Sequence, residues 1–224
     1  MQQWNKAFKN KGKIFLDAQE DMQRIVKLFK ERGVKRILDL GCGSGGHAVF
    51  LAKAGFGVFG IDIAKNGIEI TKKWLKEEGK KAADLRIGDI YKKLPYASNF
   101  FDALISTQTL HHNKIENIRK LIKEIERILK PHGLLFVTVA KHMTNKQIKE
   151  SFKPGEKLWK MKKIANRTIM PLEGDEKGLI HYFFDEKLLR KEFKNFKIHG
   201  IWTESSSKHL CLLAELKTGL DTIF

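Results

Sequence analysis

A glycine-rich loop followed by a carboxylate is the most informative chemical pattern in this sequence. Residues 39–45 read Asp-Leu-Gly-Cys-Gly-Ser-Gly and join an apolar, strand-like segment to a helix-like one. Glycines at such a junction let the backbone approach a ligand closely, and the helix start adds exposed N–H donors. Asp62 ends the next apolar segment, where a carboxylate can accept hydrogen bonds from both hydroxyls of a ribose. The pattern predicts a site for a nucleoside-containing cofactor. The alternative is that Asp62 only caps the helix that follows it.

Two adjacent histidines, His111 and His112, are the candidate catalytic residues. They follow an apolar segment that ends near residue 106, and ligands of α/β sheets bind beyond the carboxyl ends of such strands. One imidazole could act as a base, which contributes about 10² to 10⁴-fold where an acceptor must lose a proton. The other would then point into the following loop or helix, and a structural role for both is the alternative. Gln108 could orient an acceptor.

Strand-like and helix-like segments alternate and must position these residues. Short apolar runs predict five strands, at residues 34–40, 57–63, 83–87, 101–106 and 134–140. Apolar residues at helical spacing predict helices at residues 18–29, 47–54, 65–78 and 115–129. This alternation favours right-handed crossovers and an α/β, doubly wound, mostly parallel sheet with helices on both faces.

The segment after the fifth predicted strand has a different composition. Residues 141–167 are rich in Lys and Arg with interleaved aromatic and apolar residues, which predicts an insertion rather than another strand–helix unit. A helix at 185–193 follows, and strands at 196–203 and 209–216 are close enough to form an antiparallel hairpin. We expect one domain in four parts: an N-terminal helix or lid (1–33), a cofactor-binding core (34–140), a substrate-side insertion (141–184), and a terminal helix and hairpin (185–224).

Composition narrows the classes of protein. The formal net charge is +17, which suits a polyanionic partner such as RNA, but most basic residues are Lys mixed with Glu, as on a solvated surface. Cys42 and Cys211 do not suggest a disulfide framework, and CxxC and HExxH patterns are absent, so no metal site is predicted, although scattered histidines could meet in space. The apolar runs are too short for a membrane span, so we expect a cytoplasmic protein with no membrane partner.

Four segments together resemble the ordered motifs of class I S-adenosylmethionine-dependent methyltransferases. They are ILDLGCGSGGHAVFLA, VFGIDIA, IGDIYKKLPYASNFFDALISTQTLHH and LKPHGLLFVTV, within residues 34–140. The sequence pattern of dinucleotide-binding dehydrogenases does not include the last two segments, so it explains the sequence less well. The resemblance implies a Rossmann-like, seven-stranded sheet of order 3-2-1-4-5-7-6 with an insertion after strand 5, and a last strand that runs antiparallel.

The resemblance also implies S-adenosylmethionine as cofactor and S-adenosylhomocysteine as its product. The backbone of residues 41–43 would line the methionine portion, Asp62 would hold the ribose, and Asp89 would accept from the adenine amino group between Ile63 and Ile90. Asp89 as a turn residue is the alternative. The implied cofactor-binding residues are Asp39, Gly41, Cys42, Gly43, Asp62, Ile63, Asp89, Ile90, Ser106 and Thr107.

Acceptor specificity in this family comes from the N-terminal segment and from insertions after the fifth strand. Trp4, Phe8 and Phe15 could form a lid or pack on the first helix. The substrate-side candidates are Trp4, Gln108, His181 and Tyr182, and the pocket wall could also include Glu173-Gly174 and Phe183. Core packing is the alternative for Tyr182 and Phe183.

Three acceptor hypotheses remain open from the sequence. A small molecule is preferred. The chain also resembles the transfer-RNA wobble-uridine carboxymethyl methyltransferases through its Leu110-His111-His112 ending, and the basic residues 141–167 would suit an RNA strand. A basic nucleic-acid-binding module with an inactive cofactor site is the third hypothesis, disfavoured by the intact acidic and glycine positions. The oligomeric state is not indicated.

Overall fold

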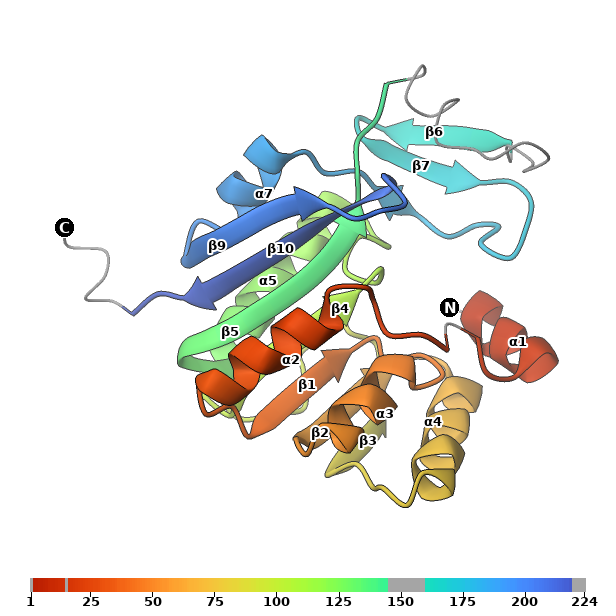
Figure 1. Cartoon of the computed structure of the whole chain (residues 1–224). Helices are drawn as coiled ribbons and strands as arrows, with labels where there is room; N and C mark the ends of the chain where they lie inside the picture. Colours follow the sequence, from red (N-terminus) through yellow and green to blue (C-terminus); the bar gives the residue numbers. More distant parts are fainter. Residues whose placement is uncertain (1, 15, 145–159, 219–224) are drawn as a thin grey trace.

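A seven-stranded, mostly parallel sheet forms the centre of the molecule (Figure 1). The computed structural model describes residues 2–14, 16–144 and 160–218. The strand order is β3-β2-β1-β4-β5-β10-β9, and β10 runs antiparallel to both of its neighbours. This confirms the predicted order and the antiparallel last strand. The strands are β1 (Arg36–Leu40), β2 (Gly57–Asp62), β3 (Asp84–Ile87), β4 (Phe101–Thr107), β5 (Leu129–Ala140), β9 (Phe196–Thr203) and β10 (His209–Leu216).

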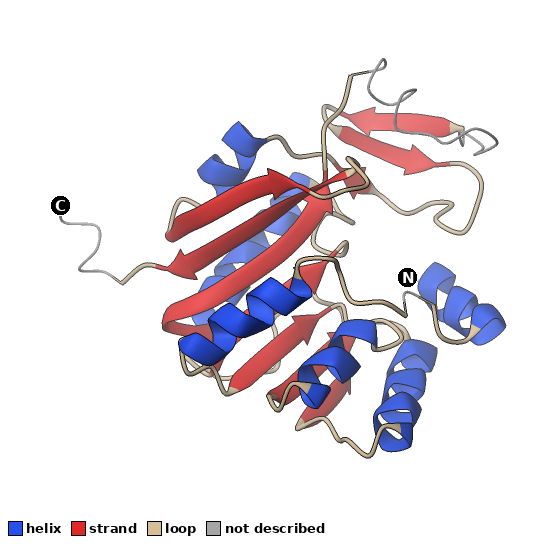
Figure 2. Cartoon of the chain, in the orientation of Figure 1, coloured by secondary structure: helices blue, strands red, loops and turns tan. Residues whose placement is uncertain are grey.

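Helices cover both faces of the sheet, as Figure 2 shows. Neighbouring residues of a strand point to opposite faces, so Ile37 of β1 belongs to one apolar cluster and Leu38 to the other. The first cluster lies under α2, α3 and α4, and the second under α5 and α7. The helices are α2 (Met22–Glu31), α3 (Gly46–Lys53), α4 (Lys65–Glu77), α5 (Ile115–Ile128) and α7 (Glu186–Glu192).

The N-terminal segment differs from the prediction. The helix expected at 18–29 begins at Met22, and a separate helix α1 (Gln2–Lys11) precedes it. This helix packs against α4, where the side chain and backbone of Asn5 hydrogen-bond to Asn66. Phe8 is buried against the glycine loop and α4 rather than on α2. Phe15 lies outside the described residues.

The segment after β5 contains a second, small sheet. It has the order β6-β7-β8, formed by β6 (Met161–Ala165), β7 (Thr168–Pro171) and β8 (His181–Tyr182), all antiparallel. Residues 145–159, the middle of the predicted basic insertion, lie outside the described residues. The backbone N–H of Tyr182 donates to the carbonyl of His111, which ties the small sheet to the loop after β4.

The C-terminal part agrees closely with the prediction. Both strands of the hairpin, β9 and β10, have the predicted bounds. Asp185 caps α7 because its carboxylate accepts from the backbone N–H of Leu188. Within the described ranges, no helix has the length and apolar character needed to cross a membrane.

Candidate active site

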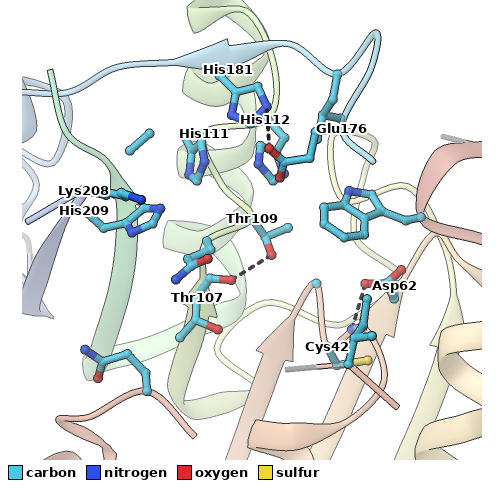
Figure 3. Close-up of a pocket in the computed structure, with 18 of the residues that line it drawn as sticks. Cys42, Asp62, Thr107, Thr109, His111, His112, Glu176, His181, Lys208 and His209 are labelled. Atoms are coloured by element: carbon cyan, nitrogen blue, oxygen red, sulfur yellow. Dashed lines mark hydrogen bonds and ion pairs between the residues drawn. The ribbon is translucent and has the colours of Figure 1, made fainter. Parts of the chain in front are cut away.

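A large cavity lies at the carboxyl edge of the parallel strands, between α1 and the small sheet (Figure 3). Its volume is about 1520 Å³. Its walls come from the glycine loop, the ends of β2 and β4, the loop after β4, the small sheet and the turn before β10. Among the described residues, all predicted site residues line this cavity except Asp39, Ser106, Glu173, Gly174 and Tyr182.

The glycine loop between β1 and α3 requires glycine for steric reasons. Gly41 has a φ of 82°, and a Cβ there would lie 2.3 Å from Cγ2 of Thr109. The backbone N–H groups of Gly41 and Cys42 both donate to the carbonyl of Ile61, so the loop is held on β2. The chain therefore passes close under the cavity and presents backbone rather than side chains to it.

Asp62 holds the glycine loop and faces the cavity. Oδ2 accepts from the N–H of Gly43 at 2.9 Å, and Oδ1 accepts from the N–H of Ala64 at 2.8 Å. Ala64 is the N-cap residue of α4, and this helix has no side-chain cap hydrogen bond, so Asp62 holds the turn before α4 and does not cap the helix. The side chain is 9% exposed, and burial raises its pKa while these backbone hydrogen bonds lower it. Each carboxylate oxygen keeps a second lone pair for a ligand.

Asp39 lies beneath the loop and is only 1% exposed. Burial, and secondarily the charge of Asp62, raises its pKa to about 8 although Ala48 donates a backbone hydrogen bond. Within the described part of the chain, Oδ2 of Asp39 has no hydrogen-bond partner. Ser106 is also buried, and its hydroxyl donates to the carbonyl of Leu40 at 3.0 Å. Both residues therefore support the loop from below instead of lining the cavity.

Asp89 is both a turn residue and a cavity residue. Its Oδ1 accepts from the backbone N–H of Tyr91 at 3.0 Å, as the turn alternative expected. It nevertheless lines the cavity beside Ile63 and Ile90, which supply apolar surface near a carboxylate. Such a combination suits an aromatic ring that carries an amino group.

Gln108 follows β4 in an uncommon backbone conformation. Its φ is 53°, in the left-handed region that non-glycine residues rarely occupy. Its N–H donates to both the carbonyl and the hydroxyl of Thr138 on β5, which holds the conformation. The strained residue lies in the cavity wall, where such conformations are often found at functional sites.

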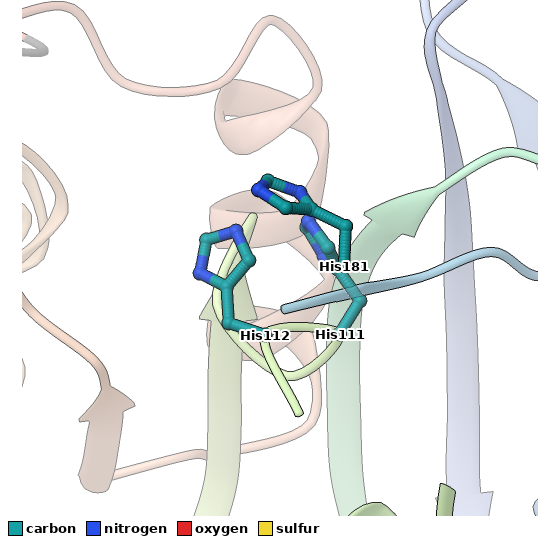
Figure 4. Close-up of side chains that lie close together, drawn as sticks. All are labelled: His111, His112 and His181. Carbon is teal, nitrogen blue, oxygen red and sulfur yellow. The ribbon is translucent and has the colours of Figure 1, made fainter. Parts of the chain in front are cut away.

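Three histidines gather at the other end of the cavity (Figure 4). The ring centroids of His111 and His112 are 4.3 Å apart, and those of His112 and His181 are 4.8 Å apart. His111 and His181 are 2% and 8% exposed, and His112 is half-buried. Burial lowers the pKa of His181 to about 4 and shifts those of His111 and His112 downward as well, so all three rings are neutral at pH 7. Trp4 stacks on His112.

The structure corrects the prediction for Tyr182. Its ring packs against Phe184 in the core, and Phe183 lines the cavity instead. Side chains alternate in direction along extended chain, so His181 and Phe183 face the cavity while Tyr182 points away from it. The core-packing alternative holds for Tyr182.

Sequence reasoning missed several cavity residues. Oε2 of Glu176 lies 3.5 Å from Nε2 of His181, and His209 lies across the cavity from Glu176 (Figure 3). His209 also hydrogen-bonds to Glu204, another residue of the cavity wall. Thr109 packs over Gly41. These residues lie in turns or at strand ends without a motif, and no local pattern indicated that they would meet.

Comparisons with known proteins identify methyltransferases as relatives of this chain. A family model described as a methyltransferase domain matches residues 38–137. EEF1A lysine methyltransferase 2 of Danio rerio is 27% identical over 177 residues, which cover 69% of this chain and 74% of that protein. The ubiquinone biosynthesis O-methyltransferase of Rickettsia canadensis is 28% identical over 122 residues, 54% of this chain and 50% of its own length. The chain thus spans about half the length of the latter relative.

A solved structure shows the same fold. The 1,6-didemethyltoxoflavin-N1-methyltransferase of Burkholderia thailandensis, solved with 1,6-didemethyltoxoflavin and S-adenosylhomocysteine, superimposes with a TM-score of 0.69. The two chains are 14% identical, and the match covers 95% of this chain and 85% of that one. At this identity the likeness concerns the fold.

Proposed function

The chain belongs to the class I S-adenosylmethionine-dependent methyltransferases, and we propose that it methylates a small molecule bound at the histidine-lined end of its cavity. The observation that carries this proposal is the extent of that cavity. At about 1520 Å³ it exceeds the roughly 300 to 1,000 Å³ typical of a site for one ligand. One end has the carboxylates and glycine loop, and the other has histidine and aromatic side chains, so two ligands can be bound side by side.

The first end fits S-adenosylmethionine. In our proposal the backbone of residues 41–43 lines the methionine portion, Asp62 accepts from the ribose hydroxyls, and Asp89 accepts from the adenine amino group between Ile63 and Ile90. The unused lone pairs of Asp62 and the closeness of the loop backbone to the cavity support this assignment. Thr107 lines the wall near the loop, while Asp39 and Ser106 position the loop from below.

Methyl transfer requires alignment more than acid–base chemistry. Bound S-adenosylmethionine supplies an electrophilic methyl group on a sulfonium, and charge disperses as the methyl moves. The chain contributes by holding the acceptor in line with this group and by keeping water out, which can provide most of the rate. Apolar wall residues such as Ile169, Leu179 and Phe183 serve the second purpose. Burial lowers the pKa of His112, which makes this imidazole a weak base, so the proposed transfer relies on alignment rather than on proton removal by this ring.

The shape of the acceptor end favours a small molecule. It is bounded by Trp4 on α1, by His181 and Phe183 near β8, and by residues of the small sheet. A compact ligand with an apolar or aromatic body and one nucleophilic oxygen, nitrogen or sulfur matches these walls. The RNA hypothesis depends on residues 141–167, most of which lie outside the described residues. A protein lysine is a further candidate, favoured by the similarity to the Danio rerio relative.

The experiment begins with calorimetric titration of S-adenosylmethionine and S-adenosylhomocysteine into the nuclease-treated protein. Methyl-labelled S-adenosylmethionine is then supplied with a metabolite extract, total transfer RNA or extracted protein in separate reactions. We expect label in the metabolite fraction, and little with Asp62→Ala. The Glu31→Gln variant, at an exposed position outside the cavity, is the control and should behave as wild type.

Other outcomes would replace the proposal in a defined way. Label confined to transfer RNA would establish the RNA hypothesis, and label confined to protein would favour a lysine acceptor. An absence of cofactor binding would favour the nucleic-acid-binding module with an inactive site.

A further inference from the structure

The three histidines of the cavity come from two segments far apart in the chain. His111 and His112 follow β4, and His181 begins β8 in the small sheet. One ring nitrogen from each lies within 4.8 Å of the other two (Figure 4). The backbone hydrogen bond from Tyr182 to His111 fixes the two segments against each other, so the grouping is built into the fold.

Two nitrogens in this group are buried without a hydrogen bond, although Oε2 of Glu176 lies 3.5 Å from one of them, Nε2 of His181. Considering only the residues that the structure describes, Nδ1 of His111 and Nε2 of His181 make no hydrogen bond. Leaving a buried polar atom unpaired costs about 1–3 kcal/mol, and native structures usually satisfy such atoms. Both residues are more than nine-tenths buried, and both line the cavity. A ligand that accepts several nitrogen lone pairs at once would satisfy them together.

The spacing of these groups suits a metal ion. Imidazole nitrogens lie about 2.0–2.1 Å from Zn²⁺, so two ligands at a tetrahedral angle are separated by roughly 3.3 Å. The carboxylate Oε2 of Glu176 is 3.5 Å from Nε2 of His181, close to that separation. The histidine nitrogens lie within 4.8 Å of one another, so they would have to approach by up to about 1.5 Å to reach this separation.

We propose that His111, His112 and His181 bind a divalent transition metal ion, Zn²⁺ in the first place, with Glu176 beside it as an anionic neighbour. Neutral imidazole suits zinc, copper, nickel and iron, whereas magnesium and calcium select oxygen ligands. Three histidines are also the protein ligands of zinc sites that leave one position open. Here the open position faces the cavity, because all three side chains line it.

The site also defines a class of acceptor. An ion at this end of the cavity would coordinate an oxygen, nitrogen or sulfur atom of the acceptor and hold it near His112. This role rests on the proposed function, but metal binding itself does not. The chain can be tested for the ion without S-adenosylmethionine and without turnover, so failure of one proposal is distinguishable from failure of the other.

The test is calorimetric titration of ZnCl₂ into the full chain after removal of metal with a chelator, with Co²⁺ absorption spectra as a second readout. We expect one equivalent of zinc to bind and Co²⁺ to give the intense visible bands of a tetrahedral site. His112→Ala, at a half-buried position, and His181→Ala should each weaken binding by more than about 100-fold, and Glu176→Gln by roughly 10 to 100-fold.

His199→Ala provides the matched control. His199 also lies beside a carboxylate, with Nε2 3.0 Å from Oε2 of Glu215, but it is outside the cavity. This variant should keep the wild-type affinity. Circular dichroism separates loss of binding from loss of fold, and the Co²⁺ spectrum of the unaltered chain needs no variant. The proposal is overturned if the wild-type chain binds no zinc, if Co²⁺ gives only weak octahedral bands, or if folded His112→Ala and His181→Ala bind zinc as wild type does.

Discussion

Replacing Asp39 by asparagine separates the shape of this side chain from its charge. Asp39 is buried beneath the glycine loop, and its pKa is raised to about 8 by burial and by the nearby charge of Asp62. Asparagine has the same shape as the protonated carboxyl and can still accept the backbone hydrogen bond from Ala48. The substitution therefore removes little except the ability to ionise.

The magnitude follows from the difference between folded and unfolded pKa values. Between the ordinary pKa of 3.8 and about 8, Asp39 carries a proton in the folded chain and not in the unfolded chain. Each pH unit in this window then lowers the free energy of unfolding by about 1.4 kcal/mol. The stability associated with a raised carboxyl pKa is present below pH 4 and is lost as pH rises. Between pH 5.5 and 7.5 the loss amounts to about 3 kcal/mol.

Urea denaturation of both proteins at half-unit steps from pH 5.5 to 9 measures this difference. The free energy of unfolding of Asp39→Asn, relative to wild type, should increase by about 3 kcal/mol between pH 5.5 and 7.5 and level off as pH approaches about 9. The exposed Asp17→Asn variant should follow the wild-type curve.

Parallel curves for Asp39→Asn and wild type would refute the reasoning, because they would mean that Asp39 ionises equally in both states. A difference that grows toward acid would also contradict it, since that sign belongs to a carboxylate stabilised by folding.

Three further predictions concern the same loop. Gly41→Ala should lower the free energy of unfolding, measured in urea, by more than about 2 kcal/mol, because the added Cβ would overlap Thr109. Gly55 also has a positive φ but lies in open space, so Gly55→Ala should lower it by only about 1 kcal/mol. Equal losses would contradict the overlap. Asp62→Ala leaves two backbone N–H groups unpaired, so it should cost about 1–3 kcal/mol for each and weaken S-adenosylhomocysteine binding at least roughly tenfold by calorimetry; unchanged affinity would remove Asp62 from the cofactor site. Cys42 lines the cavity, but it is only 7% exposed and its pKa is raised, so a chromogenic thiol reagent at pH 8 should modify it far more slowly in the folded chain than in the urea-unfolded chain, and equal rates would contradict this.

Local pattern was sufficient for most of the sheet. The strands at 196–203 and 209–216 have the predicted bounds, and the strand order is the one that the family resemblance implies. The glycine loop and Asp62 were also identified from sequence, because a sharp turn at positive φ and a strand-end carboxylate are requirements on residue type at single positions. Periodicity failed at the N-terminus, where α1 has few apolar residues and is held by packing on α4 rather than by its own pattern.

The histidine-lined end of the cavity was decided by tertiary structure alone. Whether the side chain of Tyr182 faces the core or the cavity depends on how β8 pairs with β7. The burial of Asp39 depends on the glycine loop that folds over it. The meeting of His181 and Glu176 with His111 and His112 depends on where the small sheet returns to the edge of the large one. The sequence by itself determined the strands of the sheet and the glycine loop, because neighbouring residues encode strands, helices and turns. Contacts between distant segments are set by the path of the whole chain, and no local spacing records them.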